Sequence, residues 1–307
     1  MELIGRLMGS SGGLYEIKLN SGEKVFCRAK GALRHDDLTP LVGDLVKIDR
    51  DDKGNTVLAD ILPRKNALIR PPLSNLSLLF VVIPTAKPAP DLFTVDKLTA
   101  IAIYHGIEVL PIVSKAELDP AKAEELANIY RTAGFTVFVT DSPAGLGVEP
   151  LREALAEKLR PTEEDTPICA FAGASGVGKS TLLNALFPSL ALSTGEVSRK
   201  ISRGRHTTRA VTLYETEYGG LVADTPGFTM LDFVRFDFFG KDDLPYTFPE
   251  IEAELGGCRY TKCTHTKEEG CAIMAAKAAG KIPESRHESF RALYDILKNK
   301  HDWDKKS

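Results

Sequence analysis

The chain has few cysteines and no long apolar run. Its longest apolar run, residues 76–83, is far shorter than the roughly 20 residues that a membrane-spanning helix needs. A secretory signal has a basic segment followed by an apolar one, and the first residues lack this pattern, so we expect no secretory signal. These absences predict a cytoplasmic protein without a membrane partner. Cys27 and Cys169 stand alone in apolar, strand-like contexts, and we expect both to be buried free thiols.

A large net charge is also absent, because 39 basic residues stand against 42 acidic ones and leave a net charge of -3. That balance alone argues against a nucleic-acid partner. The charges are unevenly distributed, however, since basic residues outnumber acidic ones at both ends of the chain and acidic residues predominate in the middle. The length of 307 residues predicts two or three globular domains.

Residues 1–66 alternate short apolar segments with turn residues and show no helical period. We expect five strands here, at residues 2–8, 14–19, 24–28, 44–49 and 56–61. Five short strands predict a small closed β-barrel of the OB or SH3-like kind. Its scattered basic residues suit contact with RNA, although a solvated barrel face explains them equally well. They are Arg6, Lys18, Lys24, Arg28, Lys30 and Arg34.

Residues 67–240 alternate apolar strands with amphipathic helices, the pattern of a parallel sheet built from βαβ units. Strands are expected at 76–83, 108–113, 135–140 and 168–172, and helices at 95–104, 120 onward and 149–159. Asp119 is expected to cap the second of these helices, which opens at Pro120. The sequence therefore predicts an α/β domain after the barrel.

One segment of this domain, Gly173-Ala174-Ser175-Gly176-Val177-Gly178-Lys179-Ser180, matches the phosphate-binding loop pattern at every fixed position. Glycines allow the backbone N–H groups to face phosphate oxygens at the start of the helix expected at 181–187. Lys179 is expected to reach the β and γ phosphates and Ser180 to ligate Mg²⁺. A plain glycine turn is the alternative, but it requires neither the lysine nor the serine.

A second phosphate-side motif, Asp224-Thr225-Pro226-Gly227, follows two strands expected at 211–216 and 221–223. An Asp at a strand end followed by a Gly turn is where a nucleotide hydrolase binds Mg²⁺ and senses the γ-phosphate. A chance tight turn is the alternative interpretation. Between the two motifs lies a polar, basic loop over residues 190–209.

No [NT]-K-x-D motif at the end of an expected strand, where a base-reading motif would lie, follows Gly227. Before the phosphate-binding loop, however, one strand leads into Ser114-Lys115-Ala116-Glu117 and another into Thr140-Asp141. These are the positions of the base-reading and ribose-side loops in a chain whose termini have been moved by circular permutation. The expected nucleotide-binding residues are Ser114, Lys115, Glu117, Thr140, Asp141, Gly173, Ala174, Ser175, Gly176, Val177, Gly178, Lys179, Ser180, Thr181, Asp224 and Gly227.

Near the C-terminus, four metal ligands fall within fourteen positions: Cys258, Cys263, His265 and Cys271. Three thiolates and one imidazole form a closed tetrahedral Zn²⁺ site, which leaves no open position for catalysis. A disulfide or chance clustering is the alternative. We expect residues 241–307 to form a zinc-binding helical domain, with helices at 272–279, ended by Gly280, and at 285–298, capped by Ser285.

Together these motifs resemble the RsgA family of circularly permuted GTPases that depend on the small ribosomal subunit. The matches are Gly204-Arg205-His206-Thr207-Thr208 in the basic loop, the loop at 173–180, the segment from Asp224 to Phe228, and the cysteine cluster. The resemblance implies an OB barrel, a permuted GTPase domain and a zinc-binding tail. It also implies binding to the small (30S) subunit and its 16S rRNA during late maturation, with GTP hydrolysis stimulated by the subunit. We expect the protein to act as a monomer.

The chain departs from the family pattern at Ser114 and Glu117, where [NT]-K-x-D is usual, and at Thr140-Asp141. Phe228 replaces the glutamine that orients the attacking water in many GTPases. His206 is therefore the candidate for that role, with an RNA or phosphate contact as the alternative. The expected catalytic residues are Lys179, His206 and Thr208, and Thr207 is the alternative to Thr208 as a ligand of Mg²⁺. Expected Mg²⁺ ligands are Ser180, Thr208 and Asp224.

The motifs are compatible with two other functions of the protein. One is an RNA-binding assembly factor whose nucleotide site is a switch with negligible turnover, and the other is a P-loop kinase or metabolic NTPase. The basic helical tail favours an rRNA contact over a solvated face; its basic residues are Lys277, Lys281, Arg286, Arg291 and Lys298.

Overall fold

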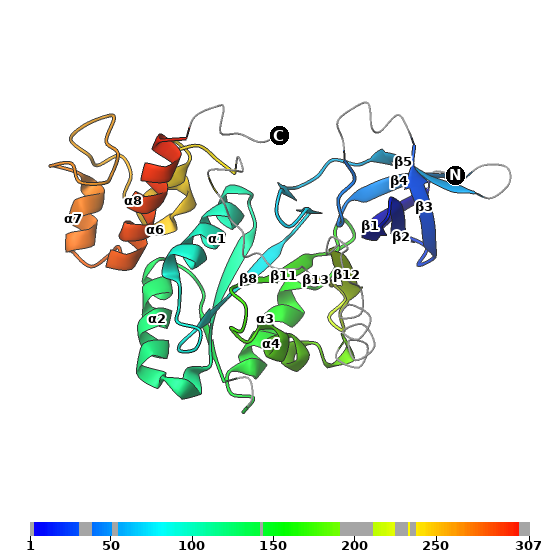
Figure 1. Cartoon of the computed structure of the whole chain (residues 1–307), viewed down its shortest axis with the longest axis horizontal. Helices are drawn as coiled ribbons and strands as arrows, with labels where there is room; N and C mark the ends of the chain where they lie inside the picture. Colours follow the sequence, from blue (N-terminus) through cyan, green and yellow to red (C-terminus); the bar gives the residue numbers. More distant parts are fainter. Residues whose placement is uncertain are drawn as a thin grey trace. The chain divides into compact units, whose positions relative to one another are not determined.

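The structure is a computed structural model that describes residues 3–30, 39–50, 55–141, 144–190, 211–224, 233 and 238–300 (Figure 1). The chain divides into two compact units. The first unit combines Met1–Leu78, Glu153–Phe171 and Leu186–Pro226. The second combines Leu79–Arg152, Ala172–Ala185 and Gly227–Ser307. Each unit therefore gathers segments that lie far apart in the sequence.

The first unit contains the barrel predicted for the N-terminal region. Its strands are β1 (Leu3–Ser11), β2 (Leu14–Leu19), β3 (Lys24–Ala29), β4 (Leu45–Arg50) and β5 (Thr56–Ile61). Their order is β1-β2-β3-β5-β4, and β4 pairs back with β1, so the barrel closes. Inward-facing apolar side chains, among them Leu7, Ile17 and Ile48, are buried in it. The predicted five-stranded barrel is confirmed.

Strand β1 has a further partner outside the barrel. It pairs antiparallel with β12 (Thr212–Glu215) at Gly9 and Thr212. Strand β12 pairs antiparallel with β13 (Leu221–Asp224), and β13 runs parallel to β11 (Ile168–Ala172). A short hairpin of β6 (Ala67–Leu68) and β7 (Leu73–Ser74) completes the strands described in this unit.

One of the six basic barrel residues predicted for RNA contact is placed differently by the structure. Arg6 is buried and donates to the carbonyl of Gly43 at 2.9 Å, with Asp165 3.5 Å away. Arg34 lies outside the described residues. A guanidinium that binds the barrel's own backbone is not available to an RNA, so Arg6 is removed from the predicted surface.

In the second unit, β8 (Leu78–Pro84), β9 (Glu108–Ser114) and β10 (Phe138–Thr140) lie side by side in the order β8-β9-β10. Its helices include α1 (Leu92–Tyr104), α2 (Pro120–Thr132) and α4 (Lys179–Leu186), and α3 (Val148–Lys158) crosses the boundary between the units. Strand β8 is fully buried. Asp119 caps α2 as predicted, accepting from the amide of Lys122 at 2.9 Å.

Two element ends differ from the prediction because of local capping. Helix α1 begins at Leu92, before the predicted Val95, since Asp91 accepts from the amide of Thr94 at 3.1 Å. Strand β10 begins at Phe138, later than predicted, because the amide of Phe135 closes the end of α2 by donating to Tyr130 at 3.0 Å. In both cases the backbone amide that moves the boundary is hydrogen-bonded at the end of a helix.

The C-terminal part of the second unit is helical, with the 3-10 turn η3 (Leu244–Thr247), α6 (Pro249–Glu252), α7 (Ala272–Ala278) and α8 (Glu284–Lys298). Gly280, in the left-handed conformation with φ +76°, ends the α7 segment as predicted. The prediction that Ser285 caps α8 is wrong. Pro283 occupies the cap position in an extended conformation, and Ser285 lies inside the helix.

The core of this part is organised around Arg286, which is fully buried on α8. Its guanidinium donates to Glu250 at 2.7 and 3.2 Å, to Asp96 on α1 at 2.7 Å, and to Thr99 at 3.1 Å. It also lies 4.4 Å from the centre of the Phe248 ring. Burial acts to lower the pKa of Arg286, but the two carboxylates outweigh it and raise the pKa above its ordinary value. Arg286 therefore cannot belong to the basic surface predicted for the tail.

No helix among the described residues is long and apolar enough to cross a bilayer. Cys27 and Cys169 are buried free thiols, as predicted. Burial raises the pKa of both thiols.

Candidate functional site

The loop between β11 and α4 has the backbone conformation that its glycines permit. Gly173, Gly176 and Gly178 all have positive φ, at +140°, +79° and +102°. A Cβ at Gly173 would lie 2.7 Å from the carbonyl oxygen of Val82 at the end of β8, so no larger residue fits there. The loop leads directly into the N-terminus of α4, where backbone N–H groups and the helix dipole attract anions.

Lys179, the first residue of α4, directs its amine into this loop. Nζ donates to the carbonyl oxygens of Gly173 at 2.7 Å and Ala174 at 2.6 Å. Burial lowers the pKa of Lys179. Ser180 and Thr181 lie in the first turn of α4 and are exposed, as are Ala174, Ser175 and Gly176, whereas Val177 is buried and anchors the loop. Ser180 is thus an exposed residue at the N-terminus of α4, directly after the phosphate-binding loop.

The segment predicted as the base-reading loop is tied to the phosphate-binding loop. Ser114, the last residue of β9, donates from Oγ to the carbonyl of Val177 at 2.7 Å. The amine of Lys115 donates to the carbonyl of Gly176 at 2.7 Å and also to that of Lys87. Glu117 is exposed in the 3-10 turn η2 (Ala116–Leu118). The structure therefore brings together two loops that are about 60 residues apart in the sequence.

The segment predicted on the ribose side lies beside it. Strands β9 and β10 are parallel, and Thr140 is the register partner of Ser114. Thr140 is buried, and Asp141 next to it accepts from the amide of Ala144 at 3.3 Å. Gly147 holds the turn against this strand, since a Cβ there would lie 2.0 Å from the carbonyl oxygen of Val139. Gly147 carried no signal in the sequence, because only the close approach of two backbones explains the need for glycine.

Asp224 is the last residue of β13, next to the strand β11 that precedes the phosphate-binding loop. Asp224 is exposed as a whole residue, but its carboxyl group is partly buried. This burial raises the pKa of Asp224. Five predicted residues, His206, Thr207, Thr208, Gly227 and Phe228, lie outside the described residues.

The four predicted metal ligands converge in the C-terminal part. One ligand atom from each of Cys258, Cys263, His265 and Cys271 lies within 4.8 Å of every other. Sγ of Cys258 is 3.5 Å from Nδ1 of His265 and 3.9 Å from Sγ of Cys271. Tetrahedral zinc separates two sulfurs by about 3.8 Å and a sulfur from an imidazole nitrogen by about 3.6 Å. The cluster could hold a metal, and its donor set and spacing fit Zn²⁺.

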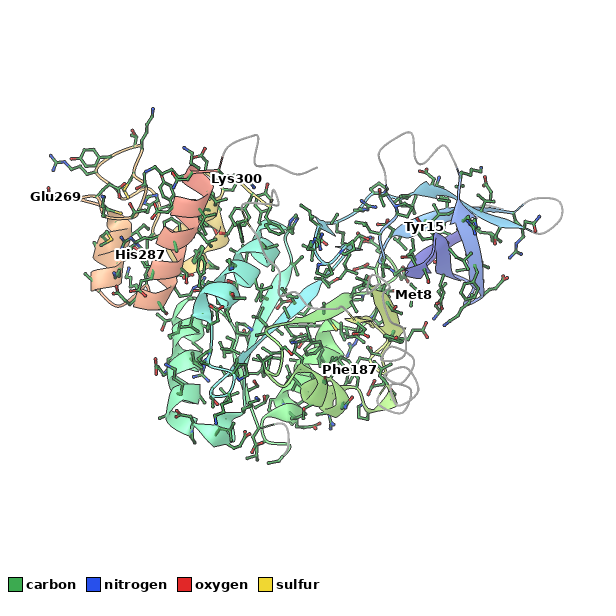
Figure 2. All side chains as sticks on the ribbon, in the orientation of Figure 1. Met8, Tyr15, Phe187, Glu269, His287 and Lys300 are labelled. Carbon is green, nitrogen blue, oxygen red and sulfur yellow. The ribbon has the colours of Figure 1, made fainter. Side chains whose placement is uncertain are left out.

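Residues around the cluster hold its loop in shape. The carboxylate of Glu268 accepts from the amides of Thr264, Thr266 and Lys267 at 2.7, 3.0 and 3.1 Å. Burial of the Glu268 carboxyl would raise its pKa, but hydrogen bonds from the Thr264 hydroxyl first, and then from backbone amides including those of Lys267 and Thr264, outweigh it and lower the pKa of Glu268 to about 2. His287 of α8 (Figure 2) is buried and donates from Nε2 to the carbonyl of His265 at 2.8 Å.

A glycine-rich loop that leads from a buried strand into a helix N-terminus, with a lysine amine inside it, defines a P-loop nucleotide-binding protein. Comparison with known families narrows this class. The chain belongs to the RsgA GTPase family, since the family model described as RsgA GTPase matches residues 61–234 and that of the RsgA N-terminal domain matches residues 4–58. The resemblance seen in the motifs is confirmed.

Relatives match over nearly the whole chain. A small ribosomal subunit biogenesis GTPase RsgA from Ruminiclostridium cellulolyticum is 37% identical over 306 residues, covering 96% of this chain and 94% of its own. One of the same name from Moorella thermoacetica is 38% identical over 286 residues, covering 93% and 94%.

Solved structures agree with the fold. YjeQ from Thermotoga maritima superposes with a TM-score of 0.80 at 27% identity, covering 98% of this chain and 100% of that one. YloQ, described as a circularly permuted GTPase, superposes with a TM-score of 0.76 at 28% identity, covering 97% and 96%. The predicted fold class, a permuted GTPase with an N-terminal barrel and a Cys₃His cluster in a C-terminal helical region, is confirmed.

Proposed function

We propose that the protein binds the small ribosomal subunit during its late maturation and hydrolyses GTP there, with turnover stimulated by the subunit. The observation that carries this proposal is the attachment of Ser114 and Lys115 to the carbonyls of Val177 and Gly176. That attachment supports a single nucleotide site assembled from a base-side loop and a phosphate-side loop in permuted order. The names of the relatives supply the ribosomal subunit as partner.

In this site the loop at 173–180 would bind the α and β phosphates, with Thr181 beside it on α4. Lys179 would exchange its two carbonyl partners for the β and γ phosphates. Ser180, Thr208 and Asp224 would hold Mg²⁺, which when bound neutralises charge developing on the phosphates. Gly227 would sense the γ-phosphate, and His206 would orient water in place of the glutamine missing at Phe228.

Ser114, Lys115 and Glu117 would read the base, with Thr140 and Asp141 on the ribose side. An ionised carboxylate only accepts hydrogen bonds. Glu117 can therefore pair with both N1–H and N2–H₂ of guanine but faces an acceptor at N1 of adenine. Lost charged hydrogen bonds are worth about 1.5–3 kcal/mol each, or roughly tenfold to a hundredfold in affinity. GDP is accordingly expected to bind more tightly than ADP.

The remaining parts of the proposal concern the flanking regions. Residues 1–66, 67–240 and 241–307 would be the barrel, GTPase and zinc-binding domains, with one structural Zn²⁺ on the Cys₃His cluster. The exposed basic side chains of the barrel and of the C-terminal part would contact 16S rRNA. The protein would act as a cytoplasmic monomer.

The test measures phosphate release from GTP by the purified protein alone, with isolated small subunits, and with large subunits as the matched control. Stimulation by small subunits only is the expected result. Nucleotide binding without turnover under all three conditions would favour an RNA-binding assembly factor with a nucleotide switch. Transfer of phosphate to a small molecule, independent of subunits, would point to a kinase.

A further inference from the structure

Lys115 has a backbone conformation that an L-residue with a long side chain seldom adopts. Its φ is +59° and its ψ is 38°, in the left-handed region favoured by glycine. The carbonyl of Lys115 then accepts from the amide of Leu118 at 3.0 Å, which closes the turn that carries Glu117. Because this conformation is unfavourable on its own, neighbouring groups must hold it in place.

Thr85 provides that restraint. It follows β8 directly and is buried, with 5% of its surface exposed. Its amide donates to the carbonyl of Ser114 at 3.1 Å, and its Oγ1 donates to the carbonyl of Lys115 at 2.6 Å. One residue of the neighbouring strand end therefore binds two consecutive carbonyls of the base-side loop.

These two carbonyls flank the point where the chain turns toward Glu117. With the carbonyl of Lys115 bound by Thr85, the amine of Lys115 reaches the carbonyl of Gly176 at 2.7 Å. Beyond it, η2 presents Glu117 at the surface, and within the described residues its carboxylate has no hydrogen bond or ion pair. The backbone that carries such a carboxylate sets the region that its side chain can reach.

We propose that Thr85 is a positioning residue for base recognition: its hydroxyl sets the peptide after Lys115 and thereby the direction of the Glu117 carboxylate toward guanine. Thr85 itself would touch neither base nor phosphate. This inference rests on the proposed function, in which residues 114–117 read the base.

The experiment compares the dissociation constants of GDP and inosine diphosphate, which lacks only the 2-amino group. Their ratio reports the bond from that amino group to Glu117, and contributions from the phosphates and from overall stability cancel in it. For the unaltered protein the ratio is expected to be about tenfold or more. Thr85→Val, which keeps the shape and removes the hydroxyl, should reduce the ratio at least threefold. Thr85→Ser, which keeps the hydroxyl, should restore it.

Thr247→Val is the matched control. Thr247 is also buried and donates from Oγ1 to a main-chain carbonyl, that of Leu244 at 2.8 Å, but it lies in η3. This variant should retain the ratio of the unaltered protein. If Thr85→Val does not fold, Thr85→Ala removes the same hydroxyl with less steric demand. In a Glu117→Gln background, Thr85→Val should change the ratio little, because Thr85 acts through Glu117.

The outcomes separate this inference from the function on which it rests. Equal affinities for GDP and inosine diphosphate in the unaltered protein would overturn the assignment of the base-reading loop, and the role of Thr85 with it. A clear preference in the unaltered protein that survives in both Thr85→Val and Thr85→Ala would overturn only the role of Thr85. A preference lost in Thr85→Val and regained in Thr85→Ser supports both.

Discussion

Replacing Arg286 with methionine tests what the buried ion network contributes to the folded second unit. Methionine has a similar length and no charge, so the substitution leaves Asp96 and Glu250 buried without their partner. Both carboxylates belong to residues that are less than a tenth exposed. Within the described residues, Oδ2 of Asp96 has no hydrogen-bond partner, and Oδ1 would keep only the hydrogen bond from the hydroxyl of Tyr130 at 3.0 Å, which carries no charge to replace that of the guanidinium.

The expected cost follows from breaking a buried pair by removing one partner, which is about 3–5 kcal/mol. For a folded unit of this size, that loss corresponds to a fall in the thermal midpoint of roughly 6–20 °C. The loss should be concentrated where Arg286 joins α8 to α1, through Asp96 at 2.7 Å. Removing the carboxylates too, by adding Asp96→Leu and Glu250→Met, should recover most of the stability because no buried charge is left unpaired.

The assay is thermal unfolding of the full chain followed by circular dichroism at 222 nm, with amide hydrogen exchange of α1 and α8 as the local measurement. Arg291→Met is the matched control, since Arg291 lies on the same helix and is exposed. A surface change of this kind shifts stability by about 0.5 kcal/mol at most, or about 2 °C. If Arg286→Met melted within that margin of Arg291→Met, the reasoning about uncompensated buried charge would be refuted.

Three shorter predictions concern the phosphate-binding loop, the Cys₃His cluster and the turn at Gly147. Lys179→Ala should reduce GTP hydrolysis about a hundredfold or more without moving the thermal midpoint, because the hydrogen bonds of its amine among the described residues go to two carbonyls of the same loop; normal turnover would remove it from the phosphate site. Metal analysis should find one zinc per chain and none in Cys263→Ser, whereas Cys27→Ser, which alters a buried thiol outside the cluster, should retain it. Gly147→Ala should destabilise the protein far more than Gly145→Ala, because its Cβ would meet a main-chain oxygen at 2.0 Å while nothing lies within 4 Å of the other; equal midpoints would contradict this.

Features with a local cause were predictable from the sequence. The strand at Ile168–Ala172 was predicted with the bounds it has, because a buried strand followed by a glycine loop is a strong local signal. The four ligands of the Cys₃His cluster were identified by residue type and spacing, and the structure brings them together. Ser114 and Thr140 were assigned to the base-reading and ribose-side loops of one site because each follows an expected strand, and the structure makes them register partners.

Features that depend on distant contacts were not predictable in this way. Arg286 was counted among surface charges because a helical pattern does not show that two carboxylates, 36 and 190 residues away, surround it. Thr85 carried no signal, since its partner lies 30 residues further along the chain. Ser285 is a good capping residue by type, yet the cap position is taken by Pro283.

The register of the strands in the first unit has a mechanical consequence. Gly9 of β1 is opposite Thr212 of β12, and Thr212 is opposite Asp224 of β13, so three strands place these residues side by side. Since β1 is also a strand of the closed barrel, the barrel is joined to the strand that ends at Asp224 first by the pair of Gly9 with Thr212 and then by the ladder between β12 and β13. Anchoring the barrel to a large particle would therefore restrain the backbone at Asp224 through the hydrogen bonds of the sheet.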